Sequence, residues 1–317
     1  RRFFLRTALA TCGAAAGCAA LWVGASERRS ARFLREMIAD AKRALAPAST
    51  KPRPEQWSDQ NLTISWLGHS MLLINFYGIR ILTDPAFSAR VGIDAGLCIL
   101  GPKRYVAPAL SWRELPPIDV VLLSHAHYDH MDLPSLKRLP APAFAATAKA
   151  TTDILKGTCL KPIVELGWNE QTVFQCAKGK LEVQAVEVKH WGRRWPSETP
   201  RGYNGYVLRR EGKAILFGGD TAYTPLFREL RSRGPYEVAM MPIGAYNPWI
   251  RSHCTPEEAL EMVNDAGARY VVPIHHQTFR LSDEPMDEPI QRLAAALDRE
   301  PERLALREMG STFICPS

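Results

Sequence analysis

The sequence contains few cysteines, and their arrangement predicts no zinc or redox motif. The seven cysteines are spread along 317 residues, at positions 12, 18, 98, 159, 176, 254 and 315. None of them forms a C-x-x-C pair, which excludes a zinc ribbon and a thioredoxin-like motif. A chain of this length can derive its stability from an apolar core, so we expect the cysteines to behave as small apolar residues.

Positive charge is scarce outside the N-terminal segment. The net charge is +7, but the first 43 residues hold nine arginines and lysines against three acidic residues and so account for six of these charges. The remainder is nearly neutral, whereas a nucleic-acid-binding protein needs basic surface to contact phosphates. We therefore expect no nucleic-acid partner. Internal repeats are absent, low complexity is confined to an alanine-rich run near the N-terminus, and nothing predicts an oligomer.

Residues 1–25 have the layout of an export signal. Arg1 and Arg2 are followed by Phe4-Leu5-Arg6 and then by an uncharged run of small residues from Thr7 to Ala25. This layout resembles the twin-arginine signal of bacteria. A transmembrane anchor is the alternative, but the many glycines and alanines make the run weakly hydrophobic for a bilayer span.

Two processing positions are compatible with this segment. Val23-Gly24-Ala25 fits ordinary cleavage, and Ala16-Gly17-Cys18 resembles a lipobox in which Cys18 carries the lipid. We expect an exported protein, either periplasmic or membrane-anchored; a cytoplasmic location is the alternative.

Residues 26–60 predict an amphipathic helix followed by a linker. Apolar residues recur at helical spacing with arginines between them, at Phe33, Leu34, Met37, Ile38, Ala41 and Leu45. Such a helix could lie on an anionic membrane or pack on the domain that follows. The stretch from Pro47 to Pro54 predicts a linker, so we expect the folded domain to span residues 61–317.

The rest of the chain predicts an α/β fold. Short runs rich in valine, isoleucine and leucine predict strands at 62–67, 70–76, 79–83, 119–124, 143–147, 181–189, 203–209, 213–218, 238–243 and 269–274. Helices are expected at 134–139, 149–156, 224–232, 255–266 and 287–298; the fourth begins with Thr255 and Glu258, the pattern of a capping box. This order indicates sheets packed between helices.

A strand that ends in metal-ligating side chains is the most informative feature. The segment VVLLSHAHYDH, residues 120–130, ends in three histidines and an aspartate. Side chains fan out in the loop after a strand, so His125 and His127 can converge on one point while Asp129 and His130 converge on another. Imidazoles and carboxylates are ligands that borderline divalent metals prefer, zinc above all. The run predicts a metal site.

HAHYDH fits the H-x-H-x-D-H signature of the metallo-β-lactamase superfamily, which this chain resembles. The resemblance implies a four-layer αβ/βα sandwich with further ligands at the ends of later strands. His190 follows LEVQAVEVK, Asp220 follows AILFGG, and His275 follows YVVPI. His276 is the alternative to His275, which takes the first position of the family's H-W-G-T-F pattern, here HHQTF.

The resemblance further implies a binuclear centre. One divalent ion would be held by His125, His127 and His190, a second by Asp129, His130 and His275, and Asp220 would bridge them. Zn²⁺ is the expected metal, with iron or manganese as alternatives. Two such cations lower the pKa of a water molecule and polarise the bond under attack, which is the chemistry of a hydrolase.

Several segments resemble one branch of this superfamily, the N-acylphosphatidylethanolamine-hydrolysing phospholipases D. They are WLGHS (66–70), ILTDPAFS (81–88), GPKRY (101–105), LPPIDVVLLSHAHYDHMD (115–132), GDT (219–221), MPIGAYNP (241–248), HCTPEEA (253–259) and DEPMDEP (283–289). The resemblance implies a phosphodiesterase that acts on a membrane phospholipid or another small phosphodiester, with peripheral membrane association. The alternatives are a lactonase of the ascorbate-6-phosphate lactonase type, a nuclease, a β-lactamase, and a metal-binding module without catalysis.

Other polar residues are candidates around this centre. Asp220 and Asp129 are expected to take part in catalysis, and His253 could orient the substrate, protonate a leaving group or simply contact a helix start. His69 could make a structural hydrogen bond or support the site from behind the ligands. Residues expected to touch the substrate or to support the ligands also include Asp84, Asp132 and Tyr246.

Overall fold

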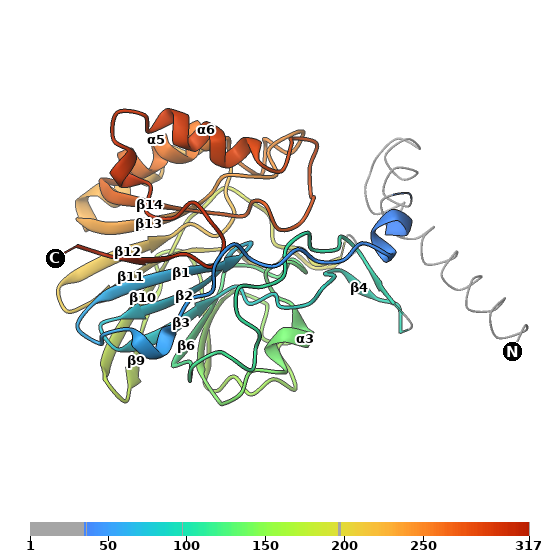
Figure 1. Ribbon diagram of the computed structural model, residues 1–317. Helices are drawn as coiled ribbons and strands as arrows, with labels where there is room; N and C mark the ends of the chain where they lie inside the picture. Colours follow the sequence, from blue (N-terminus) through green and yellow to red (C-terminus); the bar gives the residue numbers. More distant parts are fainter. Residues whose placement is uncertain (1–34, 36, 97, 196–197, 317) are drawn as a thin grey trace, which may run out of the picture.

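The computed structural model describes residues 35, 37–96, 98–195 and 198–316. Two mixed β-sheets pack face to face, and helices cover their outer faces (Figure 1). The expected αβ/βα sandwich is confirmed. The proposed signal segment 1–25, including Cys18, lies outside the described residues, as do Phe33 and Leu34.

The first sheet has seven strands in the order β15-β1-β2-β3-β6-β7-β8. Their bounds are β1 Leu62–Gly68, β2 Met71–Phe76, β3 Ile79–Thr83, β6 Val120–Leu123, β7 Phe144–Ala148, β8 Ile163–Leu166 and β15 Thr312–Ile314. Strands β3, β6, β7 and β8 run parallel, so their carboxyl ends meet at one edge of the sheet. A two-stranded hairpin, β4 Ile93–Asp94 and β5 Ile99–Leu100, projects from the same side.

The second sheet has six strands in the order β14-β13-β12-β11-β10-β9. Their bounds are β9 Gln171–Cys176, β10 Gly179–Val186, β11 Gly205–Arg210, β12 Lys213–Phe217, β13 Tyr236–Pro242 and β14 Ala268–Ile274. Strands β12, β13 and β14 are parallel, and their carboxyl ends face the same edge as those of the first sheet.

In the part of the chain that the structure describes from residue 54 onward, short to medium helices complete the sandwich. They are α3 Leu133–Leu136, α4 Phe227–Leu230, α5 Pro256–Ala266 and α6 Glu288–Ala296, together with the 3₁₀ turns η1 Pro54–Gln56, η2 Arg231–Arg233 and η3 Pro301–Arg303. Helices α5 and α6 lie over β13 and β14 (Figure 1). Among the described residues, no helix has both the length and the hydrophobicity to cross a bilayer.

Two apolar cores hold the layers together. The larger lies between the sheets and includes Trp66, Phe76 and Phe217, all fully buried; the smaller lies between the second sheet and helices α4 to α6. Tyr206 of β11 links the sheets, because its hydroxyl donates to the carbonyl of Leu123 at 2.8 Å. That contact lies two residues before His125, so it fixes the start of the histidine loop.

All ten expected strands are present, but some elements differ from the expectation. Strands β4, β5, β8, β9 and β15 were not expected. The helix predicted at 149–156 is wrong: the segment forms successive turns. The carboxylate of Glu165 accepts hydrogen bonds from the amides of Ala150, Thr151 and Thr152, and side-chain acceptors of this kind compete with the hydrogen bonds of a helix.

The segment expected to be a linker lies along the domain. The amide of Ala46 donates to the carbonyl of Tyr105 at 2.9 Å, and Thr50 donates to the carbonyl of Met309 at 3.2 Å. Just before it, residues 37–41 are helical, and Arg43 donates to the carbonyls of Lys103 and Arg104. In its described part, the amphipathic segment therefore contacts the folded domain.

The capping box predicted at Thr255 is present and positions the residues just before α5. Thr255 Oγ1 accepts from the amide of Glu258, and Glu258 Oε2 accepts from the amide of Thr255. We predict that Thr255→Ala lowers the free energy of unfolding by about 1 kcal/mol, because one partly buried helix-end amide, that of Glu258, loses its acceptor. Equilibrium urea denaturation would measure the change. Thr199→Ala, at an exposed loop threonine, is the control and should leave stability unchanged.

Candidate metal centre

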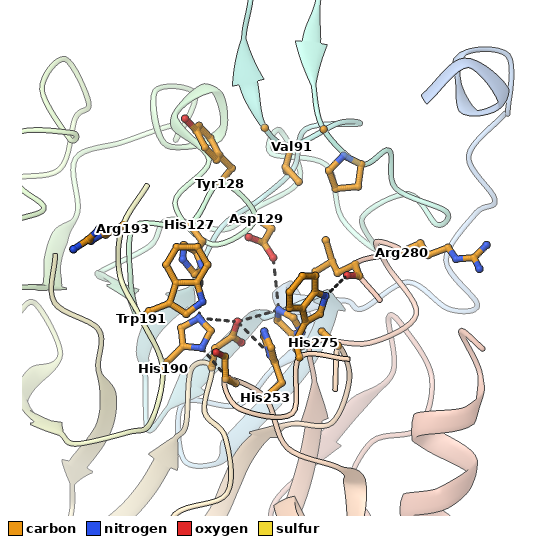
Figure 2. A pocket seen from close by; sticks show the side chains of 18 of the residues that line it. Val91, His127, Tyr128, Asp129, His190, Trp191, Arg193, His253, His275 and Arg280 are labelled. Atoms are coloured by element: carbon orange, nitrogen blue, oxygen red, sulfur yellow. Dashed lines mark hydrogen bonds and ion pairs between the residues drawn. The ribbon is translucent and has the colours of Figure 1, made fainter. Parts of the chain in front are cut away.

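The ends of strands from both sheets deliver the polar cluster. His69 follows β1, Asp84 follows β3, the run from His125 to His130 follows β6, and Asp220 and His275 follow β12 and β14. Figure 2 shows His127, Asp129, His190, His253 and His275 pointing toward one another at the base of a pocket. His69 and His275, which are 206 positions apart in the sequence, thus share one site, because parallel strands end at a common edge of the sheets.

Three imidazoles form a first group of candidate ligands, His125, His127 and His190. His127 Nδ1 lies 2.8 Å from His125 Nε2 and 3.3 Å from His190 Nε2. Nitrogens bound tetrahedrally to one zinc ion are separated by roughly 3.3 Å, given zinc–nitrogen bonds of about 2.0–2.1 Å. The three nitrogens are therefore spaced as the ligands of one ion.

A second group surrounds Asp129. Its Oδ2 lies 3.5 Å from His130 Nε2, 3.6 Å from His275 Nε2 and 2.9 Å from His69 Nε2. His275, not His276, belongs to this group. The ring of His276 instead stacks on Trp66 with the ring centroids 4.4 Å apart.

The carboxylate of Asp220 lies between the two groups. Its Oδ2 is 3.1 Å from His275 Nε2 and 3.2 Å from His130 Nε2 on one side, and 3.8 Å from His190 Nε2 and 3.9 Å from His125 Nε2 on the other. Asp220 is 3% exposed, so this carboxylate meets the imidazoles and not bulk water. One oxygen is thus placed to contact ions at both positions.

The electrostatics keep the carboxylates ionised. Burial alone would raise the pKa of Asp220, but His130 and His275 lie against it and hold that pKa well below its ordinary value. The same balance, with His130, His275 and His69 as neighbours, lowers the pKa of Asp129. Burial and the surrounding imidazoles hold the pKa of His127 far below its ordinary value, so this ring is neutral. Against the effect of burial, Asp220 and Asp129 raise the pKa of His130 and His275, that of His275 to about 9. A divalent metal would take the place of these protons, because ionised carboxylates and unprotonated imidazoles are its donor set.

Buried atoms without hydrogen-bond partners support a metal at this place. Among the described residues, His130 Nε2, His275 Nε2 and Asp220 Oδ1 are buried and have no hydrogen-bond partner within the protein. Such atoms are rare because each one costs desolvation energy. Coordination would satisfy the two imidazole nitrogens, which lie on the same side of Asp220. The His and Asp cluster is therefore able to hold metal ions.

Groups behind the candidate ligands fix the orientation of their rings. Asp84 Oδ2 accepts hydrogen bonds from His130 Nδ1 at 2.8 Å and from Ser124 Oγ at 2.6 Å. The side chains of Asp84 and His130 are fully buried. His190 Nδ1 donates to the carbonyl of Ser252 at 2.8 Å. These contacts leave Nε2 of each ring directed toward the cluster.

The backbone turns sharply at the same strand ends. His69, Asp84 and His275 have φ values of 57°, 35° and 62°, in the left-handed region that residues with a side chain rarely adopt. Thr278 Oγ1 accepts from the amide of His69 at 2.7 Å, and the amide of His275 donates to the carbonyl of His69 at 3.1 Å. Strain of this kind is typical of functional sites.

The remaining expected residues have different placements. His253 lines the pocket, with Nδ1 4.0 Å from Asp220 Oδ2. Asp132 accepts from the hydroxyls of Ser88 and Ser135, and so supports the loop after the histidines and not a histidine ring. Tyr246 differs from the expectation, because its hydroxyl donates to Glu288 of α6 at 2.7 Å and the side chain is not part of the pocket lining.

The pocket above the cluster is mostly apolar and has a volume of about 870 Å³. Apolar side chains on its walls are Met37, Val91, Ile93, Leu100, Trp191, Trp249 and Leu281. Basic residues also line it, and Figure 2 shows Arg193 and Arg280 directed outward on opposite sides. The sequence did not identify most of these residues, because their segments carry no chemistry-bearing motif.

Comparison with known proteins agrees with this geometry. A family model described as the beta-lactamase superfamily domain matches residues 79–276. An uncharacterised protein of Mycobacterium tuberculosis is 34% identical over 84% of this chain and 73% of its own length. The N-acyl-phosphatidylethanolamine-hydrolyzing phospholipase D 1 of Caenorhabditis elegans is 27% identical over 81% of this chain and 76% of its own.

Solved structures show the same fold. A metallo hydrolase from the hyperthermophilic archaeon Ignicoccus hospitalis matches with a TM-score of 0.59 at 20% identity, covering 81% of this chain and 99% of that one.

The four-layer αβ/βα sandwich carries a His and Asp cluster at its strand ends, and together with the family match and the relatives named as metal-dependent hydrolases it identifies a metal-dependent hydrolase. The chain belongs to the beta-lactamase superfamily, and its predicted resemblance to the N-acylphosphatidylethanolamine phospholipase D branch is confirmed.

The contact of Asp84 with His130 leads to a prediction about metal affinity. In Asp84→Asn the amide can donate to His130 Nδ1, which favours the proton on Nε2 and blocks that nitrogen as a ligand. We expect zinc affinity to fall by roughly 10- to 100-fold, measured by competition with a chromophoric chelator. Asp119→Asn is the matched control, since Asp119 binds the amide of Arg80 at the opposite end of β6. Equal affinity in both variants would contradict the role of Asp84.

Proposed function

We propose that this chain is a binuclear phosphodiesterase of the N-acylphosphatidylethanolamine phospholipase D type that acts on a membrane phospholipid. The observation that carries the proposal is the large apolar pocket that opens directly onto the His and Asp cluster. An apolar pocket of about 870 Å³ suits the acyl and glycerol parts of a lipid, while the cluster meets the phosphodiester. The similarity to the Caenorhabditis elegans phospholipase D supports the same choice.

The ligand assignment follows the two groups of donors. His125, His127 and His190 would hold one ion, and Asp129, His130 and His275 a second, with Asp220 between them. Zn²⁺ is our choice of metal because imidazole dominates the donor set, with iron or manganese as alternatives. When bound, two such cations supply an activated water and polarise the phosphoryl oxygens.

The protein groups would then orient the substrate and balance the charge of the site. His253 faces the cluster from the loop before α5, and burial holds the pKa of its ring well below the ordinary value. A neutral ring there can donate one hydrogen bond to the leaving oxygen without adding charge to the site. Asp220 and Asp129 balance the positive charge of the cluster. Products would be phosphatidic acid and an N-acylethanolamine.

Hydrolysis of a phosphodiester tests this proposal. We expect the purified chain to cleave bis-p-nitrophenyl phosphate and to release N-acylethanolamine from N-acylphosphatidylethanolamine in mixed micelles, followed by mass spectrometry. Both activities should disappear on chelation and return with zinc. Asp220→Ala should lower kcat/KM by more than roughly 100-fold, the upper range for losing a group that only supports a ligand.

Asp298→Ala, at an exposed carboxylate beyond α6, is the control and should retain activity. Opening of a lactone with no cleavage of any phosphodiester would favour a lactonase and overturn the proposal. Metal binding without turnover of either substrate class would favour a binding module.

We also propose that the protein is exported and associates peripherally with an anionic membrane through the rim of this pocket. Two exposed tryptophans, Trp191 and Trp249, line this pocket, and Trp249 is followed in the sequence by the exposed Ile250 and by Arg251. Tryptophan with adjacent arginine is typical of side chains at a membrane interface. The twin-arginine-like layout of the N-terminus supports export.

A pair of matched isoleucines tests the membrane contact. Ile250, 45% exposed, directly follows the pocket-lining Trp249 in the sequence, and Ile314, 55% exposed, lies on β15. Burying an isoleucine in lipid is worth at least about 1.5 kcal/mol. We expect Ile250→Ser to weaken binding to anionic vesicles by about tenfold in co-sedimentation, and Ile314→Ser to leave it unchanged. An equal effect of the two substitutions would place the contact elsewhere.

A further inference from the structure

Arg194 connects the two chain segments that provide the first group of candidate ligands. It lies four residues after His190, and its Nη1 donates to the carbonyl of Ala126 at 2.8 Å and to that of Met131 at 2.9 Å. Ala126 lies between His125 and His127, and Met131 follows His130 directly. A single guanidinium thus holds both ends of the histidine loop.

The same guanidinium also contacts the middle of that loop. Its central carbon lies 4.0 Å from the ring centroid of Tyr128, the residue between His127 and Asp129. A cation over an aromatic face adds attraction that grows when the pair is partly shielded from water. Arg194 therefore touches the loop at three places, at its start, middle and end.

The backbone around Arg194 is fixed independently of the cluster. Glu198 Oε2 accepts from the amides of Arg194 at 2.9 Å and of Trp195 at 3.2 Å. The other oxygen of Glu198 accepts from Arg201, which in turn forms an ion pair with Asp153. The guanidinium is consequently held in place by a turn that contains no candidate metal ligand.

The two candidate metal positions depend on Arg194 to different extents. The first needs His127 of the histidine loop and His190 of the next segment, whose ligand nitrogens lie 3.3 Å apart. The second is supported separately, because Asp84 orients His130 and His69 contacts Asp129 at 2.9 Å. A shift of the loop relative to residues 190–194 would thus disturb the first position most.

We propose that Arg194 is a positioning residue that sets His127 against His190 and thereby determines the affinity of the metal position they share. The inference rests on the metal assignment of the proposed function. Arginine suits this role because its guanidinium donates to both carbonyls through Nη1 while its planar face lies over the ring of Tyr128. A lysine ammonium has no planar face and would lose the stacked part of this arrangement.

Metal titration of the full chain tests the role without measuring activity. The protein is stripped with a chelator, and zinc binding is followed by competition with a chromophoric chelator. We expect two equivalents to bind to the unsubstituted chain. In Arg194→Met, one equivalent should bind more weakly by at least about tenfold while the other keeps its affinity. Arg194→Lys should weaken the same equivalent by a smaller factor.

Arg231→Met is the matched control. Arg231 also donates to two backbone carbonyls, those of Asn264 and Asp265, but at the far end of α5. It removes the same number of side-chain-to-carbonyl contacts as Arg194→Met, and both zinc equivalents should be unchanged. A purely structural role of Arg194 would make the two variants behave alike.

The outcomes separate this inference from the proposed function. Two tight equivalents in Arg194→Met overturn the role of Arg194 and leave the metal assignment intact. Fewer than two equivalents in the unsubstituted chain overturn the assignment, and the inference with it. If Arg194→Met does not fold, Arg194→Lys decides: selective weakening of one equivalent supports the role, and unchanged affinity of both overturns it.

Discussion

The buried carboxylate of Asp220 is the constraint on which the rest of the site depends. An ionised carboxylate inside a protein is costly unless positive or hydrogen-bonding groups surround it. Here five imidazole nitrogens lie within 4.0 Å of its Oδ2, from His125, His130, His190, His253 and His275. These rings come from four separate segments, so the fold must bring four strand ends or loops to one point before the carboxylate is tolerated.

The two parallel halves of the sheets solve that geometric problem. Strands β3 and β6 of the first sheet and β12 to β14 of the second all end at the same edge. The strands themselves are held by apolar packing that does not involve the cluster, as the fully buried Trp66 and Phe217 show. The polar residues therefore occupy loops on a rigid scaffold, and the left-handed backbone at His69 and His275 is held there by contacts between these loops.

Much of this arrangement could be predicted from the sequence, and the failures share one physical cause. The ten expected strands have continuous apolar runs, and the ligand candidates stand out because histidine and aspartate directly after such a run have no role in a core. Strand β9 was missed because exposed residues of this edge strand, such as Gln171 and Gln175, interrupt its apolar pattern. The helix at 149–156 failed because Glu165, outside that segment, supplies the acceptors for its amides. The direction of Tyr246 depends likewise on Glu288, 42 residues away. Local pattern cannot show contacts that the tertiary fold decides.

The separation between cluster and pocket explains why chemistry and substrate are specified by different parts of the chain. The candidate ligands follow the core strands, whereas the pocket walls come from segments outside them: Met37 before the first strand, the β4–β5 hairpin, and the loop that carries Trp249. A change in these peripheral segments would reshape the pocket without moving a strand end. Relatives with the same fold can thus share the metal chemistry and differ in the molecules they cleave, because the scaffold fixes the positions of the metal ligands but not the walls of the pocket. In this chain, Arg194 connects the pocket wall to the cluster. The segment that contains it forms one wall of the pocket, and its side chain holds the histidine loop. Substitutions in the described part of this wall that displace Arg194 would therefore also disturb the histidine loop.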